Sequence, residues 1–175
     1  MEIRAAVPAD VPELMMFYDR MCEVLGQMDF LPEGNRGDFP PQSMVEEAVR
    51  ERQQFVGVED GRIVAAYLMD HDCDEAYDAM AWQVDAPADE VGILHALRVL
   101  PEYGGRGYSR RLVEHAIAEA HSRGMRALRL DCIEGNEVPQ RLYRSYGFEH
   151  RGDADITYPD IGVPRRFLLY ELVLD

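Results

Sequence analysis

The sequence contains no lysine: its 18 basic residues are all arginine, against 33 Asp and Glu, and the formal net charge is −15 at pH 7. Such a negative field repels a phosphate backbone and an anionic lipid surface. We therefore expect neither a nucleic-acid partner nor a membrane partner. The charge instead favours a cationic small molecule or peptide.

Cysteine is scarce as well. Cys22, Cys73 and Cys132 are widely spaced and form no Cys-x-x-Cys pair, which argues against a disulfide framework and a structural zinc site and fits a reducing cytoplasm. The segment His71–Asp74 holds metal-ligand residue types, but adjacent residues seldom converge on one ion. We predict no metal site.

Long hydrophobic runs are absent too. Apolar stretches such as Arg62–Met69 fall far short of the roughly 20 residues that a membrane-spanning helix needs. The segment Met1–Arg4 is not a basic region followed by an apolar run, so we expect no signal peptide. A chain of 175 residues without repeats or linkers predicts one domain over residues 1–175, located in the cytoplasm.

Hydrophobic periodicity predicts the order strand, two helices, three strands, helix, strand, helix, two strands. The predicted strands are Glu2–Ala6, Phe55–Val58, Ile63–Met69, Val91–Val99, Ala127–Ile133, Phe148–Ala154 and Phe167–Leu174. The predicted helices carry Leu14–Leu25, Ser43–Arg52, Val113–Ala120 and Asn136–Tyr146, and a Gly/Pro-rich stretch, Pro32–Pro41, separates the first two. This order indicates a mixed α/β or α+β sheet rather than a regular doubly wound one.

A glycine-rich turn, Gly104–Ser109, joins a predicted strand directly to a helix. Free N–H groups at a helix N-terminus, with glycines that allow close approach, can bind a phosphate. The turn is not a Walker loop, because no Gly-Lys-[Ser/Thr] follows, and Arg110 stands where the dinucleotide fingerprint needs its third glycine. On its own, such a turn is as often a structural connection without a ligand as it is a ligand-binding site.

Two motifs occur together. Gly104–Ser109 matches the acetyl-CoA signature [Gln/Arg]-x-x-Gly-x-[Gly/Ala], and Asn136–Phe148, which reads NEVPQRLYRSYGF, matches a second signature. With these, the chain from Ile93 to Phe148 resembles the GCN5-related N-acetyltransferase (GNAT) superfamily, and its element order does so over nearly the whole length. The resemblance implies a GNAT acyltransferase fold, a mixed and mostly antiparallel sheet with splayed central strands and about four flanking helices.

This sequence departs from the first signature at both ends, with Gly104 in place of Gln/Arg and Ser109 in place of Gly/Ala. Gly104 removes a side chain that would shape the loop, and Ser109 brings a hydroxyl near a phosphate. Both changes leave the backbone amide donors in place, so we expect cofactor binding to persist.

The resemblance also implies a reaction: an amine, from a small molecule or a peptide, attacks the thioester of acetyl-CoA directly, with no protein nucleophile. Pantetheine would lie between the splayed strands, where the amides of Leu97 and Val99 polarise the carbonyl. Arg106 and Arg110 would offset phosphate charge. Asn136 is expected to cap its helix and, by the resemblance, to contact pantetheine. The implied cofactor-binding residues are Leu97, Val99, Gly104, Gly105, Arg106, Gly107, Tyr108, Ser109, Arg110, Asn136 and Tyr143.

The predicted catalytic residues are Tyr143, His95 and Glu90. By the resemblance Tyr143 is the acid that protonates the CoA thiolate, and a phenol of pKa ~10 suits that role; alternatively it only packs on its helix. The general base stays open. His95 shares the strand alternation of Leu97 unless a bulge reverses it, Glu90 stands at the strand's entrance, and an ordered water is the third alternative.

The segment Asp70–Glu90 carries many acids and no arginine. We expect some of them to flank the acceptor mouth and attract a cationic amine, whereas a solvated loop is the plainer alternative. Tyr77 and Trp82 either anchor this segment or line the pocket.

Two other functions compete with catalysis: a non-catalytic acyl-CoA-binding or regulatory module, and an interaction subunit whose sheet edge forms a homodimer.

Overall fold

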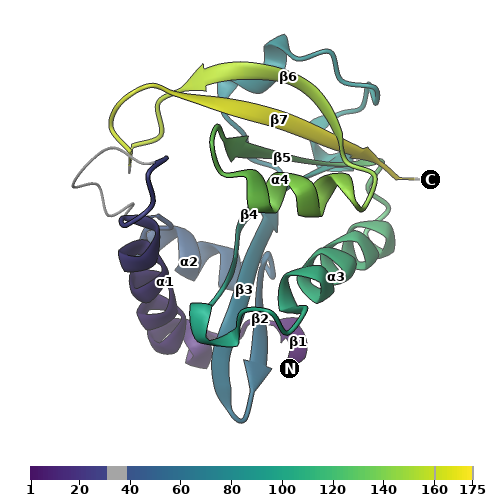
Figure 1. Ribbon diagram of the computed structural model, residues 1–175. Coiled ribbons are helices and arrows are strands. Elements are labelled where there is room, and N and C mark those ends of the chain that lie inside the picture. Colours follow the sequence, from purple (N-terminus) through teal and green to yellow (C-terminus); the bar gives the residue numbers. More distant parts are fainter. Residues whose placement is uncertain (31–38, 160, 175) are drawn as a thin grey trace.

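The computed structural model describes residues 1–30, 39–159 and 161–174, and most of the Pro32–Pro41 stretch lies outside these ranges. Its helices and strands follow the predicted order (Figure 1). The strands are β1 (Glu2–Ala5), β2 (Gln54–Glu59), β3 (Arg62–Asp70), β4 (Val91–Val99), β5 (Ala127–Ile133), β6 (Glu149–Ile156) and β7 (Arg165–Val173). The helices are α1 (Val11–Leu25), α2 (Gln42–Arg50), α3 (Tyr108–Ser122) and α4 (Glu137–Arg144).

The strands form one seven-stranded sheet in the order β1-β2-β3-β4-β5-β7-β6. All neighbouring strands are antiparallel except β4 and β5, which are parallel. Helices α1 and α2 lie on one side of the β2–β3 hairpin and α3 on the other (Figure 1). The predicted mixed, mostly antiparallel architecture is confirmed.

Strand β3 is apolar along nearly its whole length because helices cover both of its faces. Tyr67 and Met69 belong to the core under α3, whereas Ile63 and Ala66 belong to the core under α1 and α2. A strand buried on both faces reads as a continuous hydrophobic run rather than an alternating one. This strand therefore supports β4 rigidly on one side.

The segment between β3 and β4 is anchored to the sheet through Glu171, a buried carboxylate on β7. Glu171 accepts hydrogen bonds from the Gln83 amide at 2.6 Å and from Arg129 Nε at 3.1 Å. The Arg129 guanidinium also lies 4.2 Å from the centre of the Trp82 ring. Of the two roles considered for Trp82, the structure therefore shows anchoring.

Strand β4 contains a bulge at Ala96. Its φ is 48°, in the left-handed region, and the pairing of β3 with β4 shifts register beside it. A bulge inserts one extra residue and so reverses the alternation of faces beyond it. Leu94 and Leu97 both pack into the α3-side core as a result, while His95 lies on the opposite face. The prediction that His95 and Leu97 share a face is wrong for this reason.

Candidate functional site

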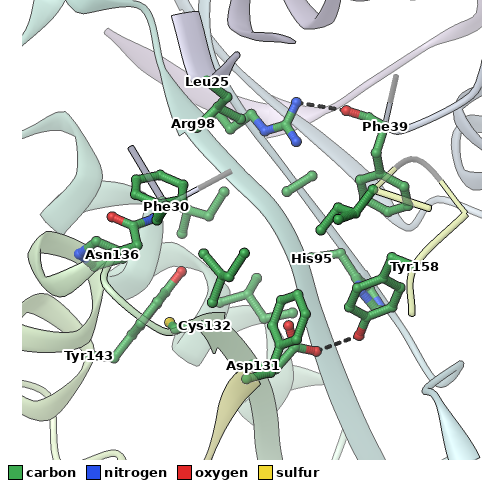
Figure 2. A pocket seen from close by; sticks show the side chains of 17 residues that line it. Leu25, Phe30, Phe39, His95, Arg98, Asp131, Cys132, Asn136, Tyr143 and Tyr158 are labelled. Atoms are coloured by element: carbon green, nitrogen blue, oxygen red, sulfur yellow. Dashed lines mark hydrogen bonds between the residues drawn. The ribbon is translucent and has the colours of Figure 1, made fainter. Parts of the chain in front are cut away.

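A gap opens between the two parallel strands in the middle of the sheet. Strands β4 and β5 pair only over Val91–Ile93 and Ala127–Arg129, although they continue to Val99 and Ile133. The gap holds a cavity of about 250 Å³ lined by both strands, by α4, by the end of α1 and by the β6–β7 connection (Figure 2). This is the splay that the resemblance implies.

Backbone amides of β4 face this gap. The Leu100 N–H donates to the Val64 carbonyl on β3 at 2.9 Å. Since successive amides along a strand point in opposite directions, the Val99 amide points away from β3 and toward the gap. Of the two predicted donors, the Val99 amide is therefore placed on the open edge of β4. Leu97 lies directly after the bulge at Ala96, where the pairing with β3 shifts register.

The glycine-rich turn lines a second pocket beside the first, together with one face of α4. Gly105 and Gly107 have φ values of 73° and 75°, a conformation that favours glycine. Gly107 is the N-cap of α3, and no described hydrogen bond uses the N–H of any residue from Gly105 to Arg110. Free amides at a helix N-terminus are groups that can donate to an anion.

Gly104 and Ser109 both line this pocket, so the two departures from the signature lie where a ligand would contact them. Gly104 has an ordinary φ of −59°, but a Cβ there would lie 3.0 Å from the Pro101 carbonyl oxygen. A side chain at position 104 would therefore need the Pro101 carbonyl to shift by a few tenths of an ångström.

The arginines near the turn divide into two groups. Arg110 lines the pocket, and so does Arg141 on α4, which was not predicted even though it lies within the second motif. Arg106 points elsewhere: it pairs with Glu59 at 3.1 Å and lies over the Tyr103 ring. The structure therefore does not bring the Arg106 side chain to the pocket. Tyr108 lines the pocket, but its hydroxyl is bound to Glu59.

Tyr143 and Asn136 both line the cavity from the α4 side. The Tyr143 ring is buried against Phe148, and its hydroxyl is directed into the cavity (Figure 2) without a partner among the described residues. Burial, reinforced by Cys132 and Asp131, raises the Tyr143 pKa above its usual value. Asn136 is the N-cap residue of α4 by position, but its side chain makes no capping hydrogen bond. The prediction that the Asn136 side chain caps α4 is wrong, and its side-chain amide is available to a ligand.

His95 lines the same cavity from β4 and is paired with Asp70 of β3. Its Nε2 lies 2.9 Å from Asp70 Oδ1 and 3.1 Å from the Asp72 carbonyl oxygen. Both partners are acceptors, so Nε2 carries a proton and Nδ1 is the basic nitrogen of the neutral ring. Burial disfavours the imidazolium, but the hydrogen bond and the charge of Asp70 outweigh it and raise the His95 pKa.

Asp131 reaches the cavity from β5, and the sequence reading missed it. Its Oδ2 accepts hydrogen bonds from the hydroxyls of Tyr77 at 2.8 Å and Tyr158 at 2.7 Å. Burial raises the Asp131 pKa, and the two tyrosine hydrogen bonds oppose that shift. The available signal was the single acid of β5, whose other residues are apolar except Arg129. Tyr77 therefore anchors its segment to a residue of the cavity.

The comparison with protein families decides the identity. The sequence model of the family described as Acetyltransferase (GNAT) family matches residues 21–148. The chain belongs to the GNAT acetyltransferase family. The matched part contains the gap, the glycine-rich turn and both motifs, so this GNAT chain carries the family's sequence features on the elements that form its two pockets.

Solved structures support the same GNAT fold. A ribosomal-protein-alanine N-acetyltransferase from Brucella melitensis is 21% identical, with a TM-score of 0.71 and 99% of this chain and 100% of that chain covered. The yncA structure from Salmonella typhimurium, which includes its cofactor acetyl-CoA, is 19% identical, with a TM-score of 0.72 and coverage of 100% and 94%. An N-acetyltransferase from Staphylococcus aureus Mu50 is 18% identical, with a TM-score of 0.74 and coverage of 99% and 98%. No curated protein matches the sequence.

Two predictions about acidic residues are not supported by the GNAT site. Glu90 lies at the paired end of β4, contacts Arg126 at 3.4 Å and is not among the described residues that line the cavity. Residues 71–90 likewise do not appear in that lining, and this segment approaches the site through the Tyr77 hydroxyl, which contacts Asp131, and the Asp72 carbonyl, which contacts His95. The carboxylate at the cavity is Asp131.

The part of the chain that the structure describes contains no group of three or more His, Cys, Asp and Glu residues that could hold a metal ion. No helix within it is long and apolar enough to cross a membrane.

Proposed function

We propose that this protein is an acetyl-CoA-dependent N-acetyltransferase that acts on an amine acceptor. The observation that carries the proposal is the gap between β4 and β5, with its cavity on one side and the unpaired amides of the glycine-rich turn beside it. A pair of parallel strands that stops pairing partway along its length leaves backbone donors unused, and a ligand that runs along the gap would satisfy them.

The residues present fit the acyl donor. The amides from Gly105 to Arg110 at the start of α3 would bind its pyrophosphate, and Arg110 and Arg141 would offset the phosphate charge. Asn136, whose side chain does not cap α4, would hydrogen-bond the pantetheine arm in the gap. Acetyl-CoA, when bound, supplies the thioester carbon that the amine attacks.

The chain's own groups would assist that attack at three points. The amides of Leu97 and Val99 stabilise the negative charge that develops on the carbonyl oxygen. The Tyr143 hydroxyl gives its proton to the leaving sulfur, and its raised pKa keeps it protonated at neutral pH. His95 Nδ1 takes the proton from the amine while Asp70 holds the ring in the required tautomer.

The proposal is tested by a screen of amines and peptides with acetyl-CoA, in which free thiol is detected and the acetylated product is identified by mass. We expect thiol release that depends on an acceptor. Binding of acetyl-CoA without acceptor-dependent release would favour the non-catalytic module instead. We also propose a cytoplasmic location, which the free thiols of Cys22, Cys73 and Cys132 support.

A further inference from the structure

We propose that Asp131 binds the acceptor as its ammonium ion, and that the acceptor is a primary amine on an apolar or aromatic body. This inference rests on the function proposed above. It assigns a specificity role to a residue outside the acid, base and oxyanion groups. It also narrows the acceptor from amines in general to one chemical class.

The two oxygens of Asp131 have different surroundings. Oδ2 accepts both tyrosine hydroxyls, from Tyr77 and Tyr158, whereas Oδ1 has no hydrogen-bond partner among the described residues. A carboxylate has about four acceptor positions, so two hydroxyl donors on one oxygen leave the other free. The tyrosines therefore fix the orientation of the carboxylate without neutralising it, and Oδ1 is the atom available to a ligand.

No cation of the described chain pairs with this carboxylate. His95, on the facing strand, has its Nε2 proton bound to Asp70. Arg98 donates to the Phe39 carbonyl at 2.7 Å, and Figure 2 shows it at the other end of the cavity from Asp131. Asp74, on the Tyr77 side, is a further negative charge near Asp131. A protonated His95 favours the ionised form of Asp131, but the two form no ion pair among the described residues. A cation bound directly at Oδ1 would therefore stabilise this partly buried carboxylate.

The remainder of the cavity favours an apolar body on that cation. Phe30, Phe39, Ile133 and Phe167 line it, and the Tyr158 ring stands beside Asp131 (Figure 2). An aromatic or aliphatic group buries its surface against these side chains, and aromatic faces also attract an ammonium. The cavity thus has one charged end and a hydrophobic wall, which is the complement of an alkyl- or arylalkyl-ammonium ion.

The test is a binding measurement on the protein saturated with CoA, which requires no turnover. Benzylamine, protonated at pH 7, is compared by calorimetry with benzyl alcohol, its neutral near-isostere, and with methylamine, which lacks the apolar body. We expect benzylamine to bind at least about tenfold more tightly than either. Equal binding of the three compounds, or no binding of benzylamine, would overturn the inference without any variant.

Variants then locate the charge. In Asp131→Asn the affinity for benzylamine should fall about tenfold or more, while the affinity for benzyl alcohol stays unchanged. Asp89→Asn, which removes an exposed acid outside the cavity lining, should bind benzylamine as the parent does. Undiminished benzylamine binding by a folded Asp131→Asn variant contradicts the inference.

The two proposals fail in different ways. Benzylamine binding that depends on Asp131, with no acetyl transfer to any amine, would refute the proposed function and leave the ammonium site standing. Acetyl transfer to amines, with the same amine affinity in the parent and in Asp131→Asn, would support the function and refute the ammonium site.

Discussion

The His95 ring is held through its Nε2 proton by Asp70, and the bulge at Ala96 follows it directly on β4. Because Nε2 donates its proton to the oxygens of Asp70 and Asp72, Nδ1 is the basic nitrogen. The Asp70 charge raises the pKa of His95 above the ordinary 6.5. A base with a raised pKa is protonated, and therefore inactive, up to a higher pH. The acid limb of kcat/KM for an amine should accordingly lie above pH 6.5.

The first prediction concerns Asp70→Asn. Removing the Asp70 charge lowers the His95 pKa, so the acid limb of the kcat/KM profile should move to lower pH while the plateau falls because the ring loses its orientation. Profiles measured from mildly acidic to mildly alkaline pH would show this. Asp89→Asn serves as the charge-matched control and should leave the limb in place. An acid limb at the same pH in Asp70→Asn as in the parent would contradict the assignment of His95 as the general base.

The second prediction concerns Tyr143→Phe. This change removes only the hydroxyl that is directed into the cavity, so kcat should fall roughly 100-fold with little change in the KM for acetyl-CoA. Steady-state kinetics with a saturating acceptor measure both constants. Tyr146→Phe, whose hydroxyl contacts Glu114 at 2.7 Å outside the cavity, should retain activity. An unchanged kcat, with chemistry limiting turnover, would rule out the acid role.

At this scale the sequence predicts residues whose place is set within a local motif. Gly107 and Tyr143 lie in or beside the two pockets because their motifs also fix the local backbone. Arg106 could not be placed this way, because its direction depends on Glu59 from another strand. Asp131 was missed because its significance depends on Tyr77 and Tyr158, which are distant in sequence.

Among the elements, the order of strands and helices was predictable because apolar spacing reports local periodicity. The sheet order and the end of pairing between β4 and β5 were implied only by the resemblance, since strand pairing joins distant segments. The bulge at Ala96 was unpredictable from periodicity, and it reversed the expected face of His95. Which face of β4 carries His95 relative to Leu97 therefore depends on this bulge, which forms in the strand pairing and not in the local sequence pattern.

The third prediction concerns the turn between β4 and α3. Gly107 and Gly61 have nearly the same backbone, with φ values of 75° and 76° and no atom within 4 Å of an added Cβ. Each alanine variant should lose about 1 kcal/mol of stability from backbone strain. Only Gly107→Ala should also weaken CoA binding, because only that glycine positions the free amides. Denaturant unfolding and CoA titration measure the two effects, and equal CoA affinity in both variants would contradict the phosphate-loop assignment.

At the scale of the whole molecule, the net charge of −15 is unevenly distributed. Arg110 and Arg141 gather at the pocket of the glycine-rich turn, whereas the acceptor cavity presents Asp131. The protein as a whole attracts cations, and the turn supplies a local site for an anion. The two proposed ligands match this distribution, since acetyl-CoA carries negative phosphates and the acceptor is a positive ammonium ion.

The fourth prediction follows from that distribution. For a cationic amine, kcat/KM should fall as ionic strength rises, because salt screens long-range attraction over about 10 Å at 0.1 M. A neutral amine of similar size, measured at the same salt concentrations, is the control and should show a smaller change. A kcat/KM for the cationic amine that does not respond to salt would show that the negative field does not guide the acceptor.

We propose that an acetyl group passes directly from acetyl-CoA to an amine in the gap between β4 and β5. The most direct measurement is the stoichiometry of CoA thiol released to acetylated amine formed, determined by mass spectrometry with and without acceptor. We expect one thiol per acetylated amine, with no acetylated protein and no thiol release when the acceptor is omitted. Thiol release without an acceptor, or bound acetyl-CoA that stays intact with every amine, would contradict it.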